Sequence, residues 1–269
     1  MAAHWLTLIK LLLAQLLSAQ ASRLDELRDK QPRLSPTELM QLIVANNPSD
    51  KFSSYHRYTS LYGRHLVSYI MNAHSKGKNV KLFEIGLGCD MRYFQGMGAS
   101  YQVWRDLLRT EKGGGDEIWG ADNNASCAAA ALNSGSDAVH VVVGDQANIT
   151  TLQQWVQQTG SDHKRGRPFD VIIDDGGHGN HQIFHSLQHL FSTALAPGGL
   201  YFIEDLHVGR LDDWSDPTGR NIIMIDVIKD WIEQLVLGKA LIRGQKFKWP
   251  LLAGLKGIEC VHHACVLLK

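Results

Sequence analysis

The sequence predicts an α/β fold in which helices cover both faces of a mostly parallel sheet. From residue 79 onward, short apolar runs alternate with stretches of helical periodicity, as they do in successive β-α-β units. The runs at residues 171–173 and 200–203 are apolar without a break, which is typical of strands buried on both faces. Both runs end in acidic residues, and ligands bind beyond the carboxyl ends of the strands in such sheets.

The chain before residue 79 is predicted to form a helical cap. Ser35-Pro-Thr-Glu38 is a capping box with proline at the first helical position, so a helix should begin there and end near Asn46. Residues 58–73 form a second candidate helix, because their apolar side chains recur on one face. We expect three parts, namely an apolar segment at residues 1–22, the cap at 23–78 and one α/β domain at 79–269.

The α/β domain should contain seven strands. Five of them alternate with helical stretches and are predicted at residues 81–85, 117–121, 139–143, 171–174 and 200–204. A long helix at residues 222–237 follows the last of these. Residues 258–262 and 264–269 are strand-like with no helix between them, so they should close the sheet as an antiparallel hairpin.

Charge and cysteine content indicate the cellular setting. The chain has 27 basic and 27 acidic residues, so no net field favours a nucleic-acid partner. The cysteines have no CxxC spacing, and we interpret all of them as free thiols of a reducing compartment. They are Cys89, Cys127, Cys260 and Cys265.

The amino-terminal segment leaves two alternatives for location. Residues 5–17 are largely apolar and Ala19-Gln-Ala21 resembles a signal-peptidase site, but Lys10 interrupts the apolar run. Two glycosylation sequons begin at Asn124 and Asn148, in predicted cofactor loops where a glycan would block binding. The sequence therefore favours a cytoplasmic protein, with secretory targeting or membrane association through residues 5–17 as the alternative.

Residues at the ends of the first strands suit a nucleoside cofactor. Gly86 and Gly88 follow the first strand and would let the backbone approach a ligand closely. Asp122 ends the second strand, where an acid commonly binds ribose hydroxyls. S-adenosylmethionine fits better than NAD, because Met91 stands where a dinucleotide site needs a third glycine. The predicted cofactor-binding residues are Glu84, Gly86, Gly88, Asp122, Asp145, Gln146 and Asp174.

A plainer interpretation of these residues stays open. The glycines would then form a tight turn, and Asp122 and Asp145 would cap helices. Three successive strand ends that each carry a suitable residue type favour the cofactor over this alternative.

The chain resembles the macrocin and mycinamicin sugar O-methyltransferase family, which also covers cephalosporin-hydroxylase-like proteins. The resemblance spans residue 49 to the carboxyl end and rests on motifs that occur in the same order. They are Ser49-Asp-Lys51, His56-Arg-Tyr-Thr-Ser-Leu-Tyr62, Glu84-Ile-Gly-Leu-Gly88, Gly120-Ala-Asp122, Gly144-Asp-Gln146, Asp174-Asp-Gly-Gly-His178, Pro197-Gly-Gly-Leu-Tyr-Phe-Ile-Glu-Asp-Leu206 and Asp226-Val-Ile-Lys-Asp230. It implies a Rossmann-like class I methyltransferase of secondary metabolism. Such an enzyme uses S-adenosylmethionine to methylate a hydroxyl of a small sugar-like or polyketide-like acceptor, and the resemblance is compatible with a homo-oligomer.

The same resemblance implies a metal-assisted reaction. It assigns Mg²⁺ to Asp175, Glu204 and Asp205, and the role of general base to His178. The local chemistry agrees, because Mg²⁺ prefers oxygen ligands and its coordination makes an alcohol more acidic. The alternative is that these acids cap a helix and form a turn. Gly177 departs from the serine that family members often carry.

Other interpretations remain at this stage. A methyltransferase-shaped scaffold without turnover is the alternative function, and a role beside an oxygenase lacks a convincing two-histidine, one-carboxylate triad. His181, His185 and His189 recur every fourth residue and predict a half-buried helix face rather than a zinc site. We expect the acceptor beneath residues 51–62 and 208–220, the second of which has the composition of a mobile lid.

Overall fold

The computed structural model describes residues 34–47, 49–89, 98–110, 114–133, 139–238 and 246–269. The predicted apolar segment with its targeting alternatives, and Met91, lie outside these residues. In the part of the chain that is described, no helix combines the length and apolar content needed to cross a bilayer.

The predicted fold class is confirmed. Seven strands form one sheet in the order β3-β2-β1-β4-β5-β7-β6, parallel from β3 to β5 and antiparallel at β7 and β6. The strands are β1 (Lys81–Ile85), β2 (Glu117–Asp122), β3 (Val139–Val143), β4 (Phe169–Asp174), β5 (Leu195–Ile203), β6 (Gly257–Cys260) and β7 (Cys265–Leu268).

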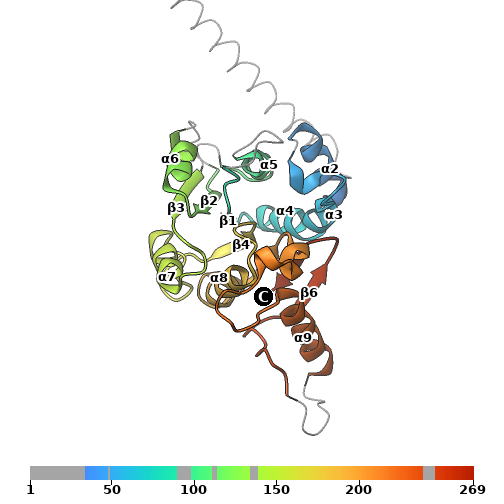
Figure 1. The fold of residues 1–269 in the computed structure, drawn as a ribbon. Coiled ribbons are helices and arrows are strands. Elements are labelled where there is room, and N and C mark those ends of the chain that lie inside the picture. The colour runs from blue at the N-terminus through green and yellow to red at the C-terminus, as the bar shows by residue number, and fades with distance from the viewer. Residues whose placement is uncertain (1–33, 48, 90–97, 111–113, 134–138, 239–245) are drawn as a thin grey trace, which may run out of the picture.

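Helices cover both faces of this sheet (Figure 1). The α-helices are α2 (Pro36–Asn46), α3 (Thr59–Tyr62), α4 (Ser68–Ser75), α5 (Ala99–Leu107), α6 (Ala125–Asn133), α7 (Ile149–Gln158), α8 (Asn180–Thr193) and α9 (Met224–Leu237). Short helical turns are η1 (Asp50–Phe52), η2 (Gly63–Val67), η3 (Leu206–Arg210) and η4 (Asp212–Trp214). The predicted capping box is present at the start of α2, where the Ser35 hydroxyl accepts from the Glu38 N–H.

Alternating strand residues supply the two halves of the core. Ile172 of β4 packs with Trp155, Leu187 and other side chains of α7, α8 and α9 on one face. Its neighbour Ile173 packs on the opposite face with α2–α6, including Trp104. Burial of a large apolar side chain contributes about 1.5–3 kcal/mol, so the uninterrupted apolar runs stabilise both layers at once. This packing fixes the strand ends that carry the site.

The cysteine prediction is wrong, because the structure pairs all four residues in disulfides. Cys89 follows β1, and Cys127 lies in α6 after β2. Because β1 and β2 are parallel neighbours in the sheet, the two Cα atoms lie 5.7 Å apart. Cys260 and Cys265 face each other across the β6–β7 ladder, with Cα atoms 4.0 Å apart. Disulfides persist in oxidising compartments, so the cysteines do not support a reducing one.

Candidate active site

One cavity of about 270 Å³ opens at the carboxyl ends of the parallel strands. Its wall contains most of the predicted site residues, contributed by the loops after five different strands. These are Gly86, Gly88, Asp122, Asp145, Gln146, Asp175, His178 and Asp205. The other three, Glu84, Asp174 and Glu204, are not in the wall and are almost fully buried.

Glycine is required where the first loop meets the fourth strand. Gly86 has a φ of +101°, and a Cβ there would lie 2.2 Å from the Asp175 carbonyl oxygen. Neither the backbone conformation nor the space admits another residue. The β1 loop therefore packs directly on the backbone that carries Asp175.

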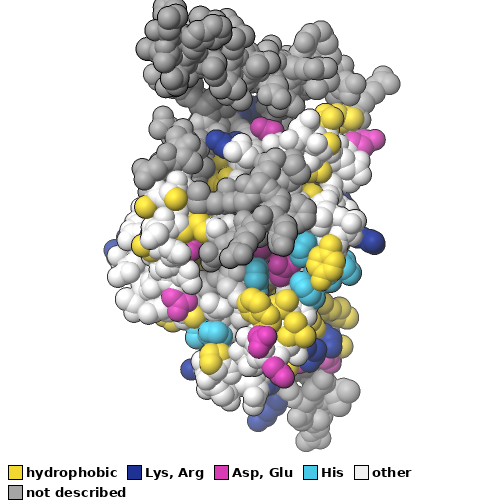
Figure 2. All heavy atoms as spheres, turned by 45° about the horizontal axis from the view of Figure 1, so that its top comes forward, with side chains coloured by type: hydrophobic (Ala, Val, Ile, Leu, Met, Phe, Trp, Pro, Cys, Tyr) yellow, Lys and Arg dark blue, Asp and Glu magenta, His cyan; other side chains and the backbone are white. Residues whose placement is uncertain are grey.

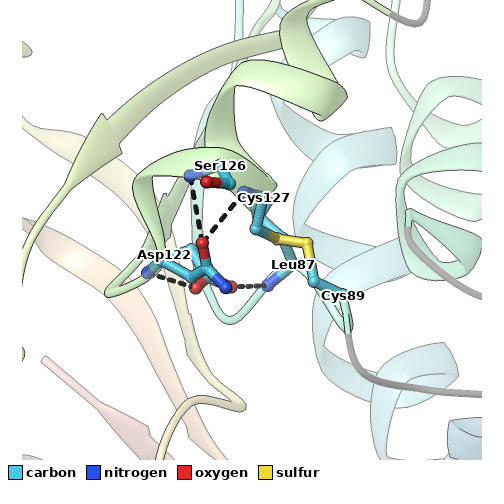
Figure 3. The surroundings of a disulfide bond; sticks show 6 residues. Leu87, Cys89, Asp122, Ser126 and Cys127 are labelled. Atoms are coloured by element: carbon cyan, nitrogen blue, oxygen red, sulfur yellow. Dashed lines mark hydrogen bonds between the residues drawn. A yellow bond between two sulfur atoms is a disulfide. The ribbon is translucent and has the colours of Figure 1, made fainter.

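Asp122 holds that loop in place (Figure 3). One carboxylate oxygen accepts from the Leu87 N–H at 3.1 Å and the other from the Asn124 N–H at 2.8 Å. The disulfide from Cys89 to Cys127 joins the same two segments. Asp122 therefore supports the β1 loop, whereas the alternative that it caps a helix is wrong, because Asn124 caps α6. The role of Asp122 in ribose binding stays a prediction.

Asp174 lies beneath the cavity and not in its wall. It is 1% exposed and accepts hydrogen bonds from Gln146 Nε2 at 2.9 Å, from the Tyr201 hydroxyl at 3.1 Å and from Ser186. Burial raises the pKa of Asp174 despite these donors. Gln146 in turn accepts from the Gly177 N–H at 2.8 Å, so this chain of contacts supports the loop that carries His178.

Lys51, which sequence reasoning did not single out as a site residue, reaches three acids. It is 2% exposed, and its Nζ lies 2.9 Å from Glu204 Oε2, 3.3 Å from Glu84 Oε1 and in contact with Asp175. Burial works to lower the pKa of Lys51, but the three carboxylates outweigh it and raise the pKa. The only sequence signal was its place in the Ser49-Asp-Lys51 motif.

The pKa values of Glu84 and Glu204, two of the acids around Lys51, are raised. Burial raises the pKa of Glu84 to about 7, although Trp104 Nε1 and the Ser100 hydroxyl donate to it at 2.8 Å and 2.9 Å. Burial, followed by the charge of Asp175, raises the pKa of Glu204. The Tyr62 hydroxyl also donates to Glu204. Both oxygens of Glu204 are therefore engaged by protein groups.

Asp175 also belongs to a candidate cation site, together with His178 and Asp205. Asp175, His178 and Asp205 each place one donor atom within 4.8 Å of the other two. His178 Nε2 lies 3.7 Å from Asp205 Oδ2, and the Tyr58 hydroxyl donates to Asp205 Oδ1 at 2.8 Å. Burial alone would raise the pKa of Asp205, but His178, Tyr58 and His56 outweigh it and lower the pKa. The structure does not bring Glu204 into this group, because Lys51 and Tyr62 hold its carboxylate.

The backbone at this site is unusual. His178 has a φ of +55° and Asp205 a φ of +53°, which is a left-handed conformation that costs non-glycine residues about 1–3 kcal/mol. Such residues are found where the surrounding structure fixes them, often at functional sites. Here both side chains turn toward each other across the ends of β4 and β5.

Comparison with known proteins shows which proteins this chain is similar to. No protein-family model matches the chain. Demethylmacrocin O-methyltransferase of Streptomyces fradiae is 28% identical over 188 residues, which is 69% of this chain and 41% of the relative. Mycinamicin VI 2''-O-methyltransferase of Micromonospora griseorubida is 30% identical over 156 residues, covering 58% and 33%. The MycE methyltransferase in complex with Mg, SAH and mycinamycin VI superposes with a TM-score of 0.64 at 22% identity over 88% of this chain and 54% of that one.

The chain is similar to the macrocin and mycinamicin O-methyltransferases. It spans less than half the length of these two curated relatives.

The glycine at position 177 has a structural explanation. A Cβ at Gly177 would lie 2.3 Å from the Gln182 amide, so Gln182 occupies the space that a serine would take. The Cys260–Cys265 disulfide closes the β6–β7 turn, and the Leu206 N–H donates to the His263 carbonyl oxygen at 2.9 Å. The turn is thereby attached to the end of β5.

A group of aromatic rings lies beside Asp205, next to the residues of the cavity wall, and we call it the histidine rim: Tyr55, His56, His207, His262 and His263. The rings of His207 and His263 stack with centroids 3.9 Å apart, and the ring of Tyr55 lies 5.1 Å from His263. Histidine and acidic side chains gather on one face of the molecule (Figure 2). Sequence reasoning missed most of this rim, because its members come from three distant segments.

The histidine stripe of α8 is half-buried, as predicted. His185 Nδ1 lies 2.8 Å from the Ala147 carbonyl oxygen, and burial lowers the pKa of His189. Among the described residues, none of the three belongs to a group with metal-ligand spacing.

Replacing Lys51 tests the acid cluster. We expect Lys51→Met to lower the free energy of unfolding by about 3–5 kcal/mol, because it leaves buried carboxylates without their cation. The exposed Lys76→Met is the control and should change stability by less than about 0.5 kcal/mol. Urea unfolding measures both, and equal effects of the two variants would contradict the role of Lys51.

The raised pKa of Glu84 predicts a pH dependence. Between its ordinary pKa of 4.5 and the folded value of about 7, the folded state keeps a proton that the unfolded state loses. The stability that this group contributes is full below pH 4.5 and is lost as the pH rises to 7. Urea unfolding across this range should show the stability advantage of the wild type over Glu84→Gln shrinking with pH. Parallel curves would show that the pKa is not raised.

Proposed function

We propose that this chain is an S-adenosylmethionine-dependent O-methyltransferase that acts on a hydroxyl of a small, polyhydroxylated acceptor. The observation that carries the proposal is a cavity that joins a glycine loop and Asp122 to Asp175, His178 and Asp205. The relatives are named as O-methyltransferases of demethylmacrocin, of mycinamicin VI and of a rhamnosyl tetracenomycin C. A sugar-like or polyketide-like acceptor fits this series.

The cofactor would lie along the ends of β1, β2 and β3. Gly86 lets the backbone approach it closely, and Asp122 would accept hydrogen bonds from its ribose hydroxyls. Asp145 is exposed at the cavity edge, where it can accept from an adenine amino group. Glu84 and Asp174 would act indirectly, by supporting these loops from below.

The donor set fits a magnesium ion. Mg²⁺ is usually held by one or two carboxylates and keeps several waters, and Asp175 and Asp205 present two carboxylates to an open cavity. When bound there, the ion would make an acceptor hydroxyl more acidic. Glu204 would support Asp175 through Lys51 rather than hold the ion directly, a role that differs from the one implied by resemblance.

His178 would accept the proton of the acceptor hydroxyl. Asp205 orients its ring from 3.7 Å, and the Trp214 ring packs with its centroid 5.7 Å away. S-adenosylmethionine would supply the methyl group that this oxygen receives, so the acceleration would depend on how the cavity positions the two substrates.

The acceptor would enter past the histidine rim and the segment of η3 and η4. The composition of residues 208–220 predicted a mobile lid, but the buried Asn180 amide donates to the Gly209 and Trp214 carbonyl oxygens at 2.7 Å and 3.1 Å. These bonds favour a fixed wall for the first half of that segment. A scaffold without turnover would not require the left-handed backbone at His178 and Asp205.

We place the reaction in an oxidising compartment and not in the cytoplasm that the sequence favoured. Both cysteine pairs are bridged in the described residues. Disulfides of this kind are rare in reducing compartments.

Loss of the disulfide at the cofactor loop should weaken cofactor binding. Cys89 lines the cavity, so Cys127→Ser frees the loop that contacts the ligand. We expect calorimetric titration to show roughly tenfold weaker S-adenosylmethionine binding, which corresponds to about 1.4 kcal/mol. Cys265→Ser, which removes the other disulfide, is the matched control and should bind as the wild type does. Equal affinities in all three proteins would disprove the coupling.

The proposed reaction is tested with radiolabelled S-adenosylmethionine, Mg²⁺ and a panel of rhamnosides and macrolide glycosides. We expect methyl transfer that falls by about 10²–10⁴-fold in His178→Ala, while cofactor affinity is unchanged. His189→Ala, at the other end of α8, should retain activity. Asp122→Ala should lose cofactor binding. Absence of S-adenosylmethionine binding by the wild type would overturn the proposal.

A further inference from the structure

Two glycosylation sequons look equivalent in the sequence, but the structure gives them different surroundings. Asn124-Ala-Ser126 follows β2 and Asn148-Ile-Thr150 follows β3, and each asparagine is exposed at the start of a helix. An oligosaccharide on an asparagine is bulky and needs open surface in the folded protein. The surroundings of the two residues decide which of them can carry one.

Asn148 is free to carry a large group. Its carboxamide oxygen caps α7 by accepting from the Thr150 and Thr151 N–H groups at 2.9 Å and 3.4 Å. Among the described residues, no acceptor is found for its Nδ2, which is the atom that a glycan uses. Asn148 is not part of the cavity wall, and its neighbours Ile149 and Thr150 are exposed as well.

Asn124 has different surroundings. It lines the cavity, and its carboxamide oxygen accepts from the Ser126 and Cys127 N–H groups at 3.0 Å and 3.1 Å. Its sequon is followed directly by Cys127, whose disulfide joins α6 to the β1 loop. A glycan here would stand at the mouth of the cavity, as the sequence had suggested for both sites.

The cysteines supply an independent observation about compartment. The structure contains two disulfides, Cys89–Cys127 and Cys260–Cys265, and such bonds form in the secretory pathway, where asparagine glycosylation also occurs. The apolar run at residues 5–17 with Ala19-Gln-Ala21 has the composition of a secretory signal. The chemistry of the cysteines and the exposed sequon therefore indicate the same environment.

We propose that Asn148 is an N-glycosylation site of this chain. In the modification, Asn148 Nδ2 forms a bond to the anomeric carbon of an oligosaccharide whose donor is a lipid-linked diphosphate. The bond from that carbon to the diphosphate oxygen breaks, the diphosphate leaves with the electron pair, and Nδ2 gives up one proton. The helix cap survives, because it uses the carboxamide oxygen and not the nitrogen.

The test uses the full chain, expressed with a carboxyl-terminal tag in cultured animal cells. Peptide N-glycosidase F removes asparagine-linked glycans and converts the modified residue to aspartate, which a reducing gel and peptide mass spectrometry detect. We expect a mobility shift for the wild type and for Asn124→Gln, and no shift for Asn148→Gln. Thr150→Ala should also abolish the shift, while Thr150→Ser keeps the sequon and should retain it.

The Thr150 pair guards against a folding artefact, because both variants leave the Asn148 cap in place. Conversion to aspartate at residue 148 in the wild-type peptide, lost in Thr150→Ala, supports the proposal. Absence of any shift in the wild type overturns it. A shift that disappears in Asn124→Gln and persists in Asn148→Gln overturns it as well. Methyltransferase activity enters none of these readouts, so failure of the proposed reaction would leave the result unaffected.

Discussion

The buried ammonium of Lys51 is the interaction on which the site depends. Glu84 near the end of β1, Asp175 after β4 and Glu204 after β5 converge on Lys51, because β1, β4 and β5 are neighbours in the sheet. Carboxylates buried together without a cation would be strongly unfavourable. Lys51 comes from the helical cap, so the cap completes the electrostatics of the sheet edge and is not a separable addition.

The ammonium group of Lys51 also explains why the adjacent acids Glu204 and Asp205 have different environments. Glu204 is held below the cavity by Lys51 and Tyr62, whereas Asp205, the next residue, turns into the cavity through a left-handed backbone. Two adjacent acids therefore have opposite environments: burial raises the pKa of Glu204, and nearby donors and cations lower the pKa of Asp205. An ionised Asp205 is suited to orient His178 or to bind a cation, and Glu204 is suited to support the floor.

The side of the cavity that we propose for the cofactor is held by a different kind of constraint. Gly86 brings the β1 loop into contact with the backbone of Asp175, and the Cys89–Cys127 disulfide joins that loop covalently to α6. Such a disulfide persists only where thiols are oxidised, so this constraint on the β1 loop requires an oxidising environment. The exposed sequon at Asn148 lies on the next loop along the sheet edge, outside the cavity.

The sequence by itself determined the elements and the sheet edge that carries the site. Local patterns sufficed for the capping box before α2, the apolar strands, the glycine loop and the closing hairpin, because these depend on neighbours within a few residues. Only the tertiary structure decided which acids face the cavity, where Lys51 lies and how the cysteines pair. Those outcomes depend on contacts between residues that are far apart in the chain, such as Lys51 and Glu204 or Cys89 and Cys127. No spacing rule in the sequence contains such contacts, because parallel packing of the strands creates them.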